Sequence, residues 1–232
     1  MIVDIQFSPA VNDWPELRDA VLKAEAEGYT TTWVFDHFDG AMLGGDRPML
    51  ECFTLLGALA EATASSGSGT IGLGTLVANV VNRHPAHLAL AASTVQRISG
   101  GRLILGLGAG SAPGTKWATE HGDRGIALQP VLADRHAAVI EQMRVVREAF
   151  AVPLILGVNS VELARTAGRL ADGINVRMAH PRAAEFVSAA CEEAAGRPFD
   201  ISGWAFTTDE TANDRAAELG LDRLIMVEMG KL

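Results

Sequence analysis

The stretch "TIGLGTLVANVVNRHPAHLALAASTVQRISGGRLILGLGAG", residues 70–110, contains two short apolar runs separated by a segment with helical character. The runs at 70–76 and 102–107 are largely apolar on both faces, which is typical of parallel strands covered by helices. Between them the sequence predicts a helix over 85–98, because a proline suits its first position and two glycines follow its end. The stretch therefore predicts one parallel strand–helix–strand unit.

The same alternation continues along the whole chain. Strands are predicted at 2–7, 31–35, 70–76, 102–107, 153–156, 173–176, 200–206 and 223–228. Helices are predicted at 14–27, 50–64, 85–98, 130–150, 160–171, 181–195 and 210–219. Eight strands alternating with helices predict an α/β fold, a (β/α)8 or TIM barrel, with residues 1–232 as a single domain and a compact second half. An open doubly wound sheet is the alternative, since a short strand is easily misassigned.

Composition limits the classes of partner. The chain has 232 residues, 48% of them hydrophobic, and a net charge of −9, so we do not expect it to bind nucleic acid. No apolar run approaches the ~18 residues of a membrane helix, and the first residues lack the basic segment of a signal peptide. The two cysteines, Cys52 and Cys191, form no CxxC motif. The sequence predicts a cytoplasmic protein with no membrane partner and no disulfide framework.

Polar residues follow several of the predicted strands, where a barrel would gather them at one mouth. "WVFDHF", residues 33–38, ends its apolar run in Asp36 and His37. Histidine exchanges a proton near neutral pH, so His37 is suited to serve a bound carbonyl or alcohol. The alternative is structural, with the pair closing a strand and Asp36 capping the next helix.

Two glycine-containing loops are candidates for binding a ligand. "GLGAGS", at 106–111, keeps the backbone bare so that a flat ring can approach, although an ordinary glycine-rich loop is the alternative. "LILGVNS", at 154–160, opens a helix whose free N–H groups suit an anion, with a plain helix cap as the alternative. The predicted contact residues in these loops are Gly108, Ala109, Gly110, Ser111, Gly157, Val158, Asn159 and Ser160.

Arg83 and the remaining histidines give weaker signals. Arg83 suits either an anionic ligand tail or a structural bond to a loop carbonyl. His84 and His87 have a spacing that permits metal binding, but no carboxylate accompanies them, so we expect no metal site. His121 follows Glu120 in a long loop, and we expect it to be solvated.

The predicted helix at 50–64 is apolar nearly all round, so we expect it to be buried on two sides. An outer helix of a barrel contacts the sheet on one side only. Either a subunit interface or a covering loop would bury its other side, and the first of these predicts a homodimer.

Four stretches together resemble the bacterial luciferase-like family: "WVFDHF", "LECFTLLGALAEAT", residues 71–110 and "VPLILGVNSVELARTAGRLADGINV". They resemble most closely its branch of oxidoreductases that use the deazaflavin coenzyme F420. The resemblance implies a (β/α)8 barrel with the cofactor ring at the C-terminal mouth. It also implies a non-proline cis peptide against the ring, in a bulge at Thr75, Leu76 and Val77.

The resemblance implies further contacts. Phosphate contacts of the family fall on 157–160, and the histidine that assists hydride transfer falls on His37. Asn79 and Arg177, at the ends of two further strands, complete the predicted cofactor-binding residues.

The sequence also departs from the family. Some F420 dehydrogenases have a tryptophan four residues after the histidine and a glutamate after the fourth-strand glycines, where this chain has Ala41 and Ser111. Phe150 runs almost directly into Pro153, where relatives have an insertion that covers the site. We therefore expect no sugar phosphate substrate, and a pocket that is open or is closed by a partner subunit.

The combined prediction is an oxidoreductase that transfers a hydride between F420 and a small organic substrate. His37 moves the proton, and Asp36 orients His37. Two alternatives stay open. One is an FMN-dependent luciferase-like monooxygenase, in which the same loops hold the FMN phosphate. The other is a non-catalytic flavin- or deazaflavin-binding protein, which the replacements at 41 and 111 suggest.

Overall fold

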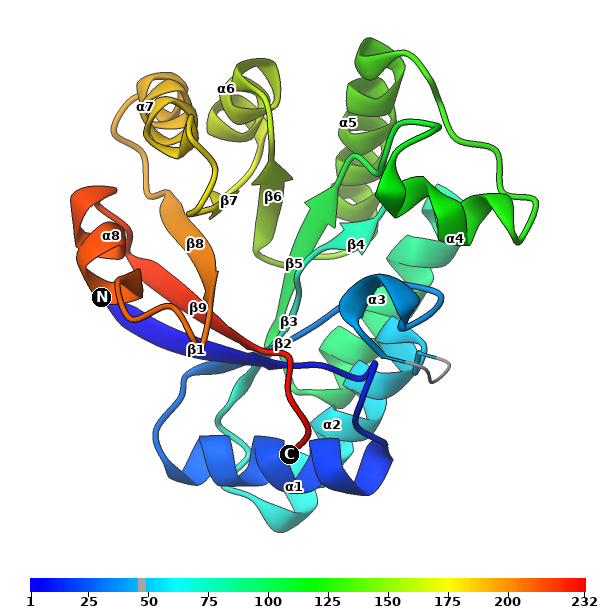
Figure 1. Cartoon of the computed structure of the whole chain (residues 1–232), viewed down its shortest axis with the longest axis vertical. Coiled ribbons are helices and arrows are strands. Elements are labelled where there is room, and N and C mark those ends of the chain that lie inside the picture. The colour runs from blue at the N-terminus through cyan, green and yellow to red at the C-terminus, as the bar shows by residue number, and fades with distance from the viewer. Residues whose placement is uncertain (46–48) are drawn as a thin grey trace.

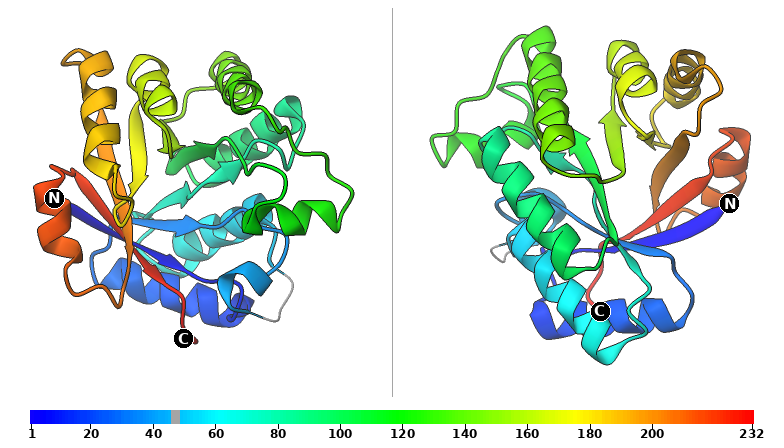
Figure 2. Two further views of the ribbon diagram at one scale, coloured as in Figure 1. Left: turned by 45° about the horizontal axis from the view of Figure 1, so that its top comes forward. Right: turned by 180° about the vertical axis from the view of Figure 1, so that it is seen from behind.

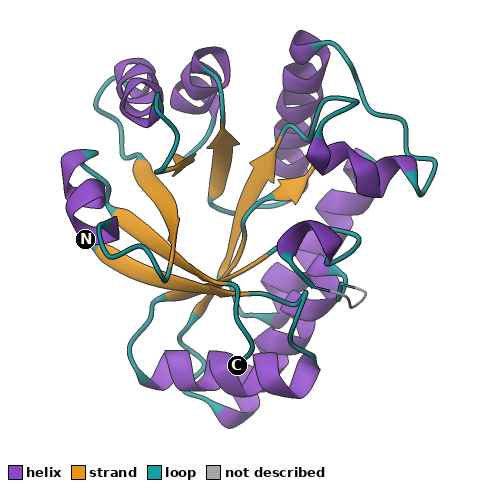
Figure 3. Ribbon diagram, in the orientation of Figure 1, coloured by secondary structure: helices purple, strands orange, loops and turns teal. Residues whose placement is uncertain are grey.

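A computed structural model of the chain describes residues 1–45 and 49–232, and it consists of parallel strands surrounded by helices (Figure 1, Figure 3). The strands are β1 (Ile2–Phe7), β2 (Thr31–Val34), β3 (Gly72–Thr75), β4 (Ala78–Asn79), β5 (Leu103–Gly108), β6 (Leu154–Val158), β7 (Gly173–Arg177), β8 (Asp200–Phe206) and β9 (Arg223–Glu228). All except β4 coincide closely with the predicted strands, since each of these is a short, largely apolar run bounded by polar residues or glycine.

The sheet closes on itself. Its order is β3-β2-β1-β9-β8-β7-β6-β5-β4, and β3 also pairs with β5. β3 and β4 are two pieces of one stave, because Leu73 of β3 pairs with Leu103 and Ala78 of β4 pairs with Leu107 further along β5. The nine strands described therefore form eight staves of a closed parallel barrel. The predicted TIM barrel is confirmed, and the open sheet is excluded.

The helices lie outside the barrel in both views of Figure 2. They are α1 (Trp14–Ala26), α2 (Cys52–Ser66), α3 (Pro85–Ile98), α4 (Thr119–Gly122), α5 (Leu132–Ala149), α6 (Val161–Leu170), α7 (Ala183–Ala194) and α8 (Ala212–Glu218). All except α4 match predicted helices, because local signals mark their ends. Pro85 opens α3, and Gly100 follows it with a φ of 66°, in the left-handed region that glycine adopts easily.

The barrel interior has its own small apolar layer, made of Trp33, Ile155 and Ile225. At the end where the strands begin, Asp4 is fully buried and accepts a hydrogen bond from Trp33 Nε1 at 2.9 Å. Arg223, at the start of β9, forms an ion pair with the same carboxylate. These contacts fill the N-terminal end of the barrel, so a site inside it must open at the C-terminal mouth.

Helix α2 packs against α1, α3 and β3 of its own chain, which bury most of its apolar surface. A groove remains along α2 and α3, lined among others by Gly57, Leu90, Ala91 and Ile98. The homodimer therefore stays a prediction. Within the described ranges, no helix is both long and apolar enough to cross a membrane.

Candidate active site at the barrel mouth

The stave formed by β3 and β4 is interrupted by a turn at Leu76 and Val77. The peptide bond between these two residues is cis, as the resemblance implied. Thr75 is buried just before the turn, and its hydroxyl donates to the carbonyl oxygen of Gly106 on β5 at 2.7 Å. The turn carries Val77 toward the neighbouring staves β5 and β6.

The glycines of β5 and β6 make room for this turn. A Cβ on Gly106 would lie 2.1 Å from the carbonyl oxygen of Thr75, and a Cβ on Gly108 would lie 2.5 Å from Val77 Cγ2. A Cβ on Gly157 would lie 2.9 Å from Val77 Cγ1. The bare backbone at 106 and 108 was expected to let a flat ring approach. The structure gives a different reason, since Thr75 and Val77 occupy that space.

A cavity of about 780 Å³ opens at this end of the barrel. It brings together most of the predicted site residues: Asp36, His37, Leu76, Val77, Asn79, Gly108, Ala109, Gly110, Ser111, Gly157, Val158, Asn159 and Arg177. Thr75 and Ser160 do not line it. Thr75 is turned to Gly106, and Ser160 Oγ accepts the backbone N–H of Leu163 at 3.2 Å as the N-cap of α6. For Ser160 the helix-cap alternative is therefore the one observed.

Other walls of the cavity were not identified from the sequence. They are Gln6, Phe35, Leu43, Lys116, Trp117, Asn175, Trp204, Phe206, Val227 and Met229. Seven of the ten are apolar or aromatic, and nothing in the sequence distinguishes these seven from ordinary core positions. The cavity thus combines apolar walls with a few polar groups, which is usual for a site that binds a small molecule.

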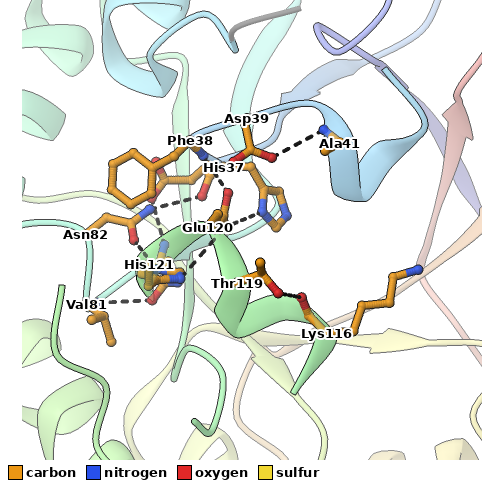
Figure 4. A network of polar contacts seen from close by, with 12 residues as sticks. His37, Phe38, Asp39, Ala41, Val81, Asn82, Lys116, Thr119, Glu120 and His121 are labelled. Carbon is orange, nitrogen blue, oxygen red and sulfur yellow. Dashed lines mark hydrogen bonds and ion pairs between the residues drawn. The ribbon is translucent and has the colours of Figure 1, made fainter. Parts of the chain in front are cut away.

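His37 follows β2, and its ring is held by a carboxylate from α4 (Figure 4). His37 Nδ1 lies 2.8 Å from Glu120 Oε1, and Glu120 Oε2 accepts the backbone N–H of Phe38 at 2.7 Å. The Glu120 side chain is 1% exposed, whereas that of His37 is 24% exposed toward the mouth. The imidazole is therefore fixed from behind and remains accessible at its other side.

The environment of Glu120 keeps it ionised. Burial alone would raise the pKa of this carboxyl group. The hydrogen bond with His37, the charge of His37, the N–H of Phe38 and the charge of His121 together outweigh burial, so the pKa of Glu120 lies below its usual value. A carboxylate at this position favours the His37 tautomer that carries its proton on Nδ1.

The segment that carries Glu120 is anchored to the barrel by its next residue. His121 is 1% exposed, and its Nε2 lies 2.8 Å from Asn82 Oδ1 and 3.3 Å from Asn79 Nδ2. The expectation that His121 is solvated is wrong, because α4 folds back onto the mouth. In the sequence, the only feature that could have pointed to Glu120 and His121 is an acid followed directly by a histidine in a loop without predicted structure.

The same segment supplies an aromatic ring. Trp117 lies three residues before Glu120, and its ring centre is 5.7 Å from that of His37. The tryptophan and the glutamate of some F420 dehydrogenases are replaced by Ala41 and Ser111 in this chain. An indole and a carboxylate nevertheless lie against His37, and both come from the segment that follows β5.

Asp36 has a different partner from the predicted one. Its carboxylate binds Arg83 through two hydrogen bonds, of 2.7 and 2.8 Å, and accepts the backbone N–H of Asn79 at 2.8 Å. Arg83 also pairs with Glu51, the N-cap of α2. Asp36 therefore ties the end of β2 to β4 and to the loop before α3, and the residue that orients His37 is Glu120. Arg83 likewise binds two carboxylates instead of a ligand tail or a loop carbonyl.

Two cations at the cavity lack a carboxylate partner in the described part of the chain. Arg177, at the end of β7, lies over the Trp204 ring at 5.8 Å, and Lys116 lies over the Trp117 ring at 5.4 Å. Asn159, just before α6, lines the same cavity. These groups could hold an anion at the mouth. Among residues 1–45 and 49–232, no cluster of three metal-binding side chains occurs.

Two named relatives match the chain in sequence. The 5,10-methylenetetrahydromethanopterin reductase of Methanolobus tindarius is 28% identical over 240 residues, which cover 91% of this chain and 67% of the reductase. The F420-dependent glucose-6-phosphate dehydrogenase of Amycolatopsis mediterranei (strain U-32) is 29% identical over 150 residues, which cover 62% of this chain and 38% of the dehydrogenase. The chain thus spans about two thirds of the first relative and well under half of the second.

Solved structures and a family model complete the comparison. An F420-dependent secondary alcohol dehydrogenase in complex with an F420-acetone adduct matches with a TM-score of 0.77 at 14% identity. The match covers 99% of this chain and 94% of the dehydrogenase, and it concerns the fold. The model of the luciferase-like monooxygenase family matches residues 4–152. Since this match covers more than half of the sequence, the chain belongs to the luciferase-like monooxygenase family.

Proposed function

We propose that the chain is an F420-dependent oxidoreductase that transfers a hydride between the deazaflavin and a small organic substrate. The observation that carries the proposal is His37, which is held by Glu120 and lines the same cavity as the Leu76–Val77 turn. Addition of a hydride to a polar double bond, and its removal from the corresponding alcohol or amine, needs a proton partner beside the substrate, and histidine meets that need near neutral pH. The names of the relatives support the choice of cofactor.

The walls of the cavity fit a flat ring with an anionic tail. Leu76 and Val77 would contact the ring, because they lie together at the cavity wall. Lys116, Arg177 and Asn159 would hold the anionic tail. Bound F420 supplies a ring carbon that accepts or donates a hydride.

The Glu120 carboxylate determines which ring nitrogen of His37 is available to a substrate. Because the carboxylate occupies Nδ1, Nε2 is the nitrogen left for a substrate, and no described residue bonds it. In the oxidation of an alcohol, neutral Nε2 would accept the hydroxyl proton. In the reverse direction, protonated Nε2 would return it, and the Glu120 charge would stabilise the imidazolium.

The FMN-dependent monooxygenase is the second candidate, because the matching family model is described as a luciferase-like monooxygenase. The same cations and helix start would hold the phosphate of FMN. A purely binding protein was suggested by the missing insertion before Pro153 and by the replacements at Ala41 and Ser111. The second of these reasons has less weight, because Trp117 and Glu120 both contact the His37 ring. We also propose that the enzyme acts on a small molecule as a homodimer.

The proposal is tested by turnover with a panel of alcohols, carbonyl compounds and imines, using F420 in both oxidation states. We expect turnover with F420, and a fall of about 100-fold or more in His37→Ala with the affinity for F420 within a few-fold of wild type. Oxygen uptake with reduced FMN, and no reaction with F420, would select the monooxygenase. Full turnover in His37→Ala would contradict the role of His37.

A further inference from the structure

Gln6, on β1, is a buried amide without a partner. Its side chain is fully buried, and neither Oε1 nor Nε2 has a hydrogen-bond partner among the described residues. An unmet donor and acceptor in the interior are costly, and native proteins seldom retain them without a reason. Gln6 lines the cavity at the barrel mouth. Both of its polar atoms are closed to solvent in this conformation, so a bound molecule can supply the missing partners once an adjoining side chain of the cavity moves aside.

The surroundings of Gln6 indicate the kind of group that would bind there. We call the part of the cavity lined by Gln6, Leu76, Asn175, Trp204 and Val227 the cavity floor, because apart from Leu76 these residues lie within strands. Three of them are apolar or aromatic. Asn175 is the other amide, and its Nδ2 is already used by Ser202 Oγ at 3.0 Å.

None of the five residues of the floor is charged, and the Arg177 guanidinium is engaged over the ring of Trp204 at the edge of the floor. Asp4, two positions before Gln6 on β1, is already bound by Arg223 and by Trp33 Nε1. An ionic group placed on the floor would lose its hydration without gaining a counter-charge. A neutral group is therefore expected, and it must present an acceptor and a donor side by side to satisfy both ends of the amide.

We infer that Gln6 binds the imide edge of the deazaflavin ring, where an N–H stands between two carbonyl groups. This inference rests on the proposed function, because it takes its ligand from the proposed cofactor. The Gln6 carbonyl accepts the ring N–H, and the Gln6 NH₂ donates to an adjacent ring carbonyl. Gln6 thereby fixes how deeply and in which orientation the ring sits, without taking part in the proton transfer at His37.

The test uses the deazaflavin ring system without its tail, the same ring methylated at the imide nitrogen, and F420 itself. Calorimetric titration of the wild type, Gln6→Leu and Gln142→Leu gives a dissociation constant for each pair. Gln142 is the matched control, because it is also fully buried with an unpartnered Oε1 but lies on α5, outside the cavity. Thermal unfolding of each unliganded protein is measured in parallel.

We expect the wild type to bind the methylated ring about 10-fold more weakly than the parent ring, because the methyl group removes the donor. Gln6→Leu should bind both rings equally and about 10-fold more weakly than the wild type binds the parent. Gln142→Leu should behave as the wild type. Gln6→Leu should also raise the Tm of the unliganded protein, because it removes two unmet polar atoms.

The inference is overturned if the wild type binds both rings equally, a comparison that needs no variant. It is also overturned if Gln6→Leu keeps the wild-type affinity. If the wild type binds neither the ring nor F420, the proposed function fails and the inference fails with it. If the wild type binds F420 but does not discriminate between the two rings, the inference about Gln6 fails and the proposed function stands.

Discussion

Two carboxylates lie close to His37, one in sequence and one in space, and they have different partners. Asp36 is its chain neighbour and binds Arg83 and the backbone of Asn79. Glu120 binds the His37 ring itself. At the residue scale, removing the charge of Glu120 should therefore have different consequences from removing the charge of Asp36.

Glu120→Gln should reduce stability in a pH-dependent way. The folded protein holds the pKa of Glu120 below 4.5, because hydrogen bonds and positive charge outweigh burial. The resulting stabilisation is complete above the unfolded pKa and is lost as the pH falls through the folded pKa. We expect Glu120→Gln to lower the free energy of unfolding by about 2 kcal/mol at pH 7, with a smaller difference below about pH 4.

Urea unfolding of both proteins across this pH range measures the effect. Glu210→Gln is the control, because Glu210 is exposed and its loss should change little. A difference between Glu120→Gln and the wild type that stayed constant from neutral to acid pH would argue against an ionised, stabilising Glu120.

Asp36→Asn should mainly affect stability. The Arg83 and Asp36 side chains are 11% and 3% exposed, so removing the charge of Asp36 leaves a largely buried guanidinium with Glu51 alone. We expect a loss of about 3 kcal/mol in the free energy of unfolding, compared with little change in the exposed Asp214→Asn. Chemical unfolding at pH 7 provides the comparison, and a loss below about 1 kcal/mol would contradict this role.

The sequence allowed His37 to be identified because it ends a strand directly after an apolar run. Glu120 could not be identified in this way, since it is 83 positions from His37 and lies in a segment without periodicity. The pairing of Asp36 with Arg83 spans 47 positions. Partners brought together by the closure of the barrel leave no local pattern in the chain.

At the scale of elements, the interrupted stave of β3 and β4 determines the shape of the cavity. Val77 enters the space above β5 and β6 only because Gly108 and Gly157 carry no side chain. The family resemblance predicted the position of the turn, and the glycines can be read directly from the sequence. It could not predict that the glycines serve the turn, because that depends on the register between β3, β4 and β5.

Gly108→Ala should collide with Val77 and lower the free energy of unfolding by about 2 kcal/mol. In a Val77→Ala background, Cγ2 is gone and the penalty should fall to about 0.5 kcal/mol, which a double-mutant cycle measures. Gly57→Ala is the control, because a Cβ there meets nothing within 4 Å in helix α2, and alanine should stabilise it slightly. Additive effects of the two substitutions would refute the contact.

At the scale of the whole molecule, the fold was predictable and the assembly was not. Short strands that are apolar on both faces and helices with marked ends are local features, and closure follows from their number. Whether a second copy covers the groove along α2 and α3 depends on a surface that the strand pattern does not describe. Of its lining residues, Leu90 is 64% exposed and Ile98 is 50% exposed.

We expect a homodimer in solution that uses this groove. Light scattering after size exclusion should give twice the chain mass of 24.5 kDa. Leu90→Asp should shift the mass to that of a monomer, because burying an unpaired charge is unfavourable. The exposed Leu170→Asp on α6 is the control and should leave the mass unchanged. A wild type that stays at the mass of one chain would contradict the prediction.

The central claim is that the barrel mouth holds a deazaflavin. A parallel equilibrium titration of the purified chain with F420 and with FMN tests it most directly. We predict a dissociation constant for F420 of about 10 μM or below, and an affinity for FMN at least about 10-fold weaker. No binding of F420 at about 1 mM, or tighter binding of FMN than of F420, would contradict the account.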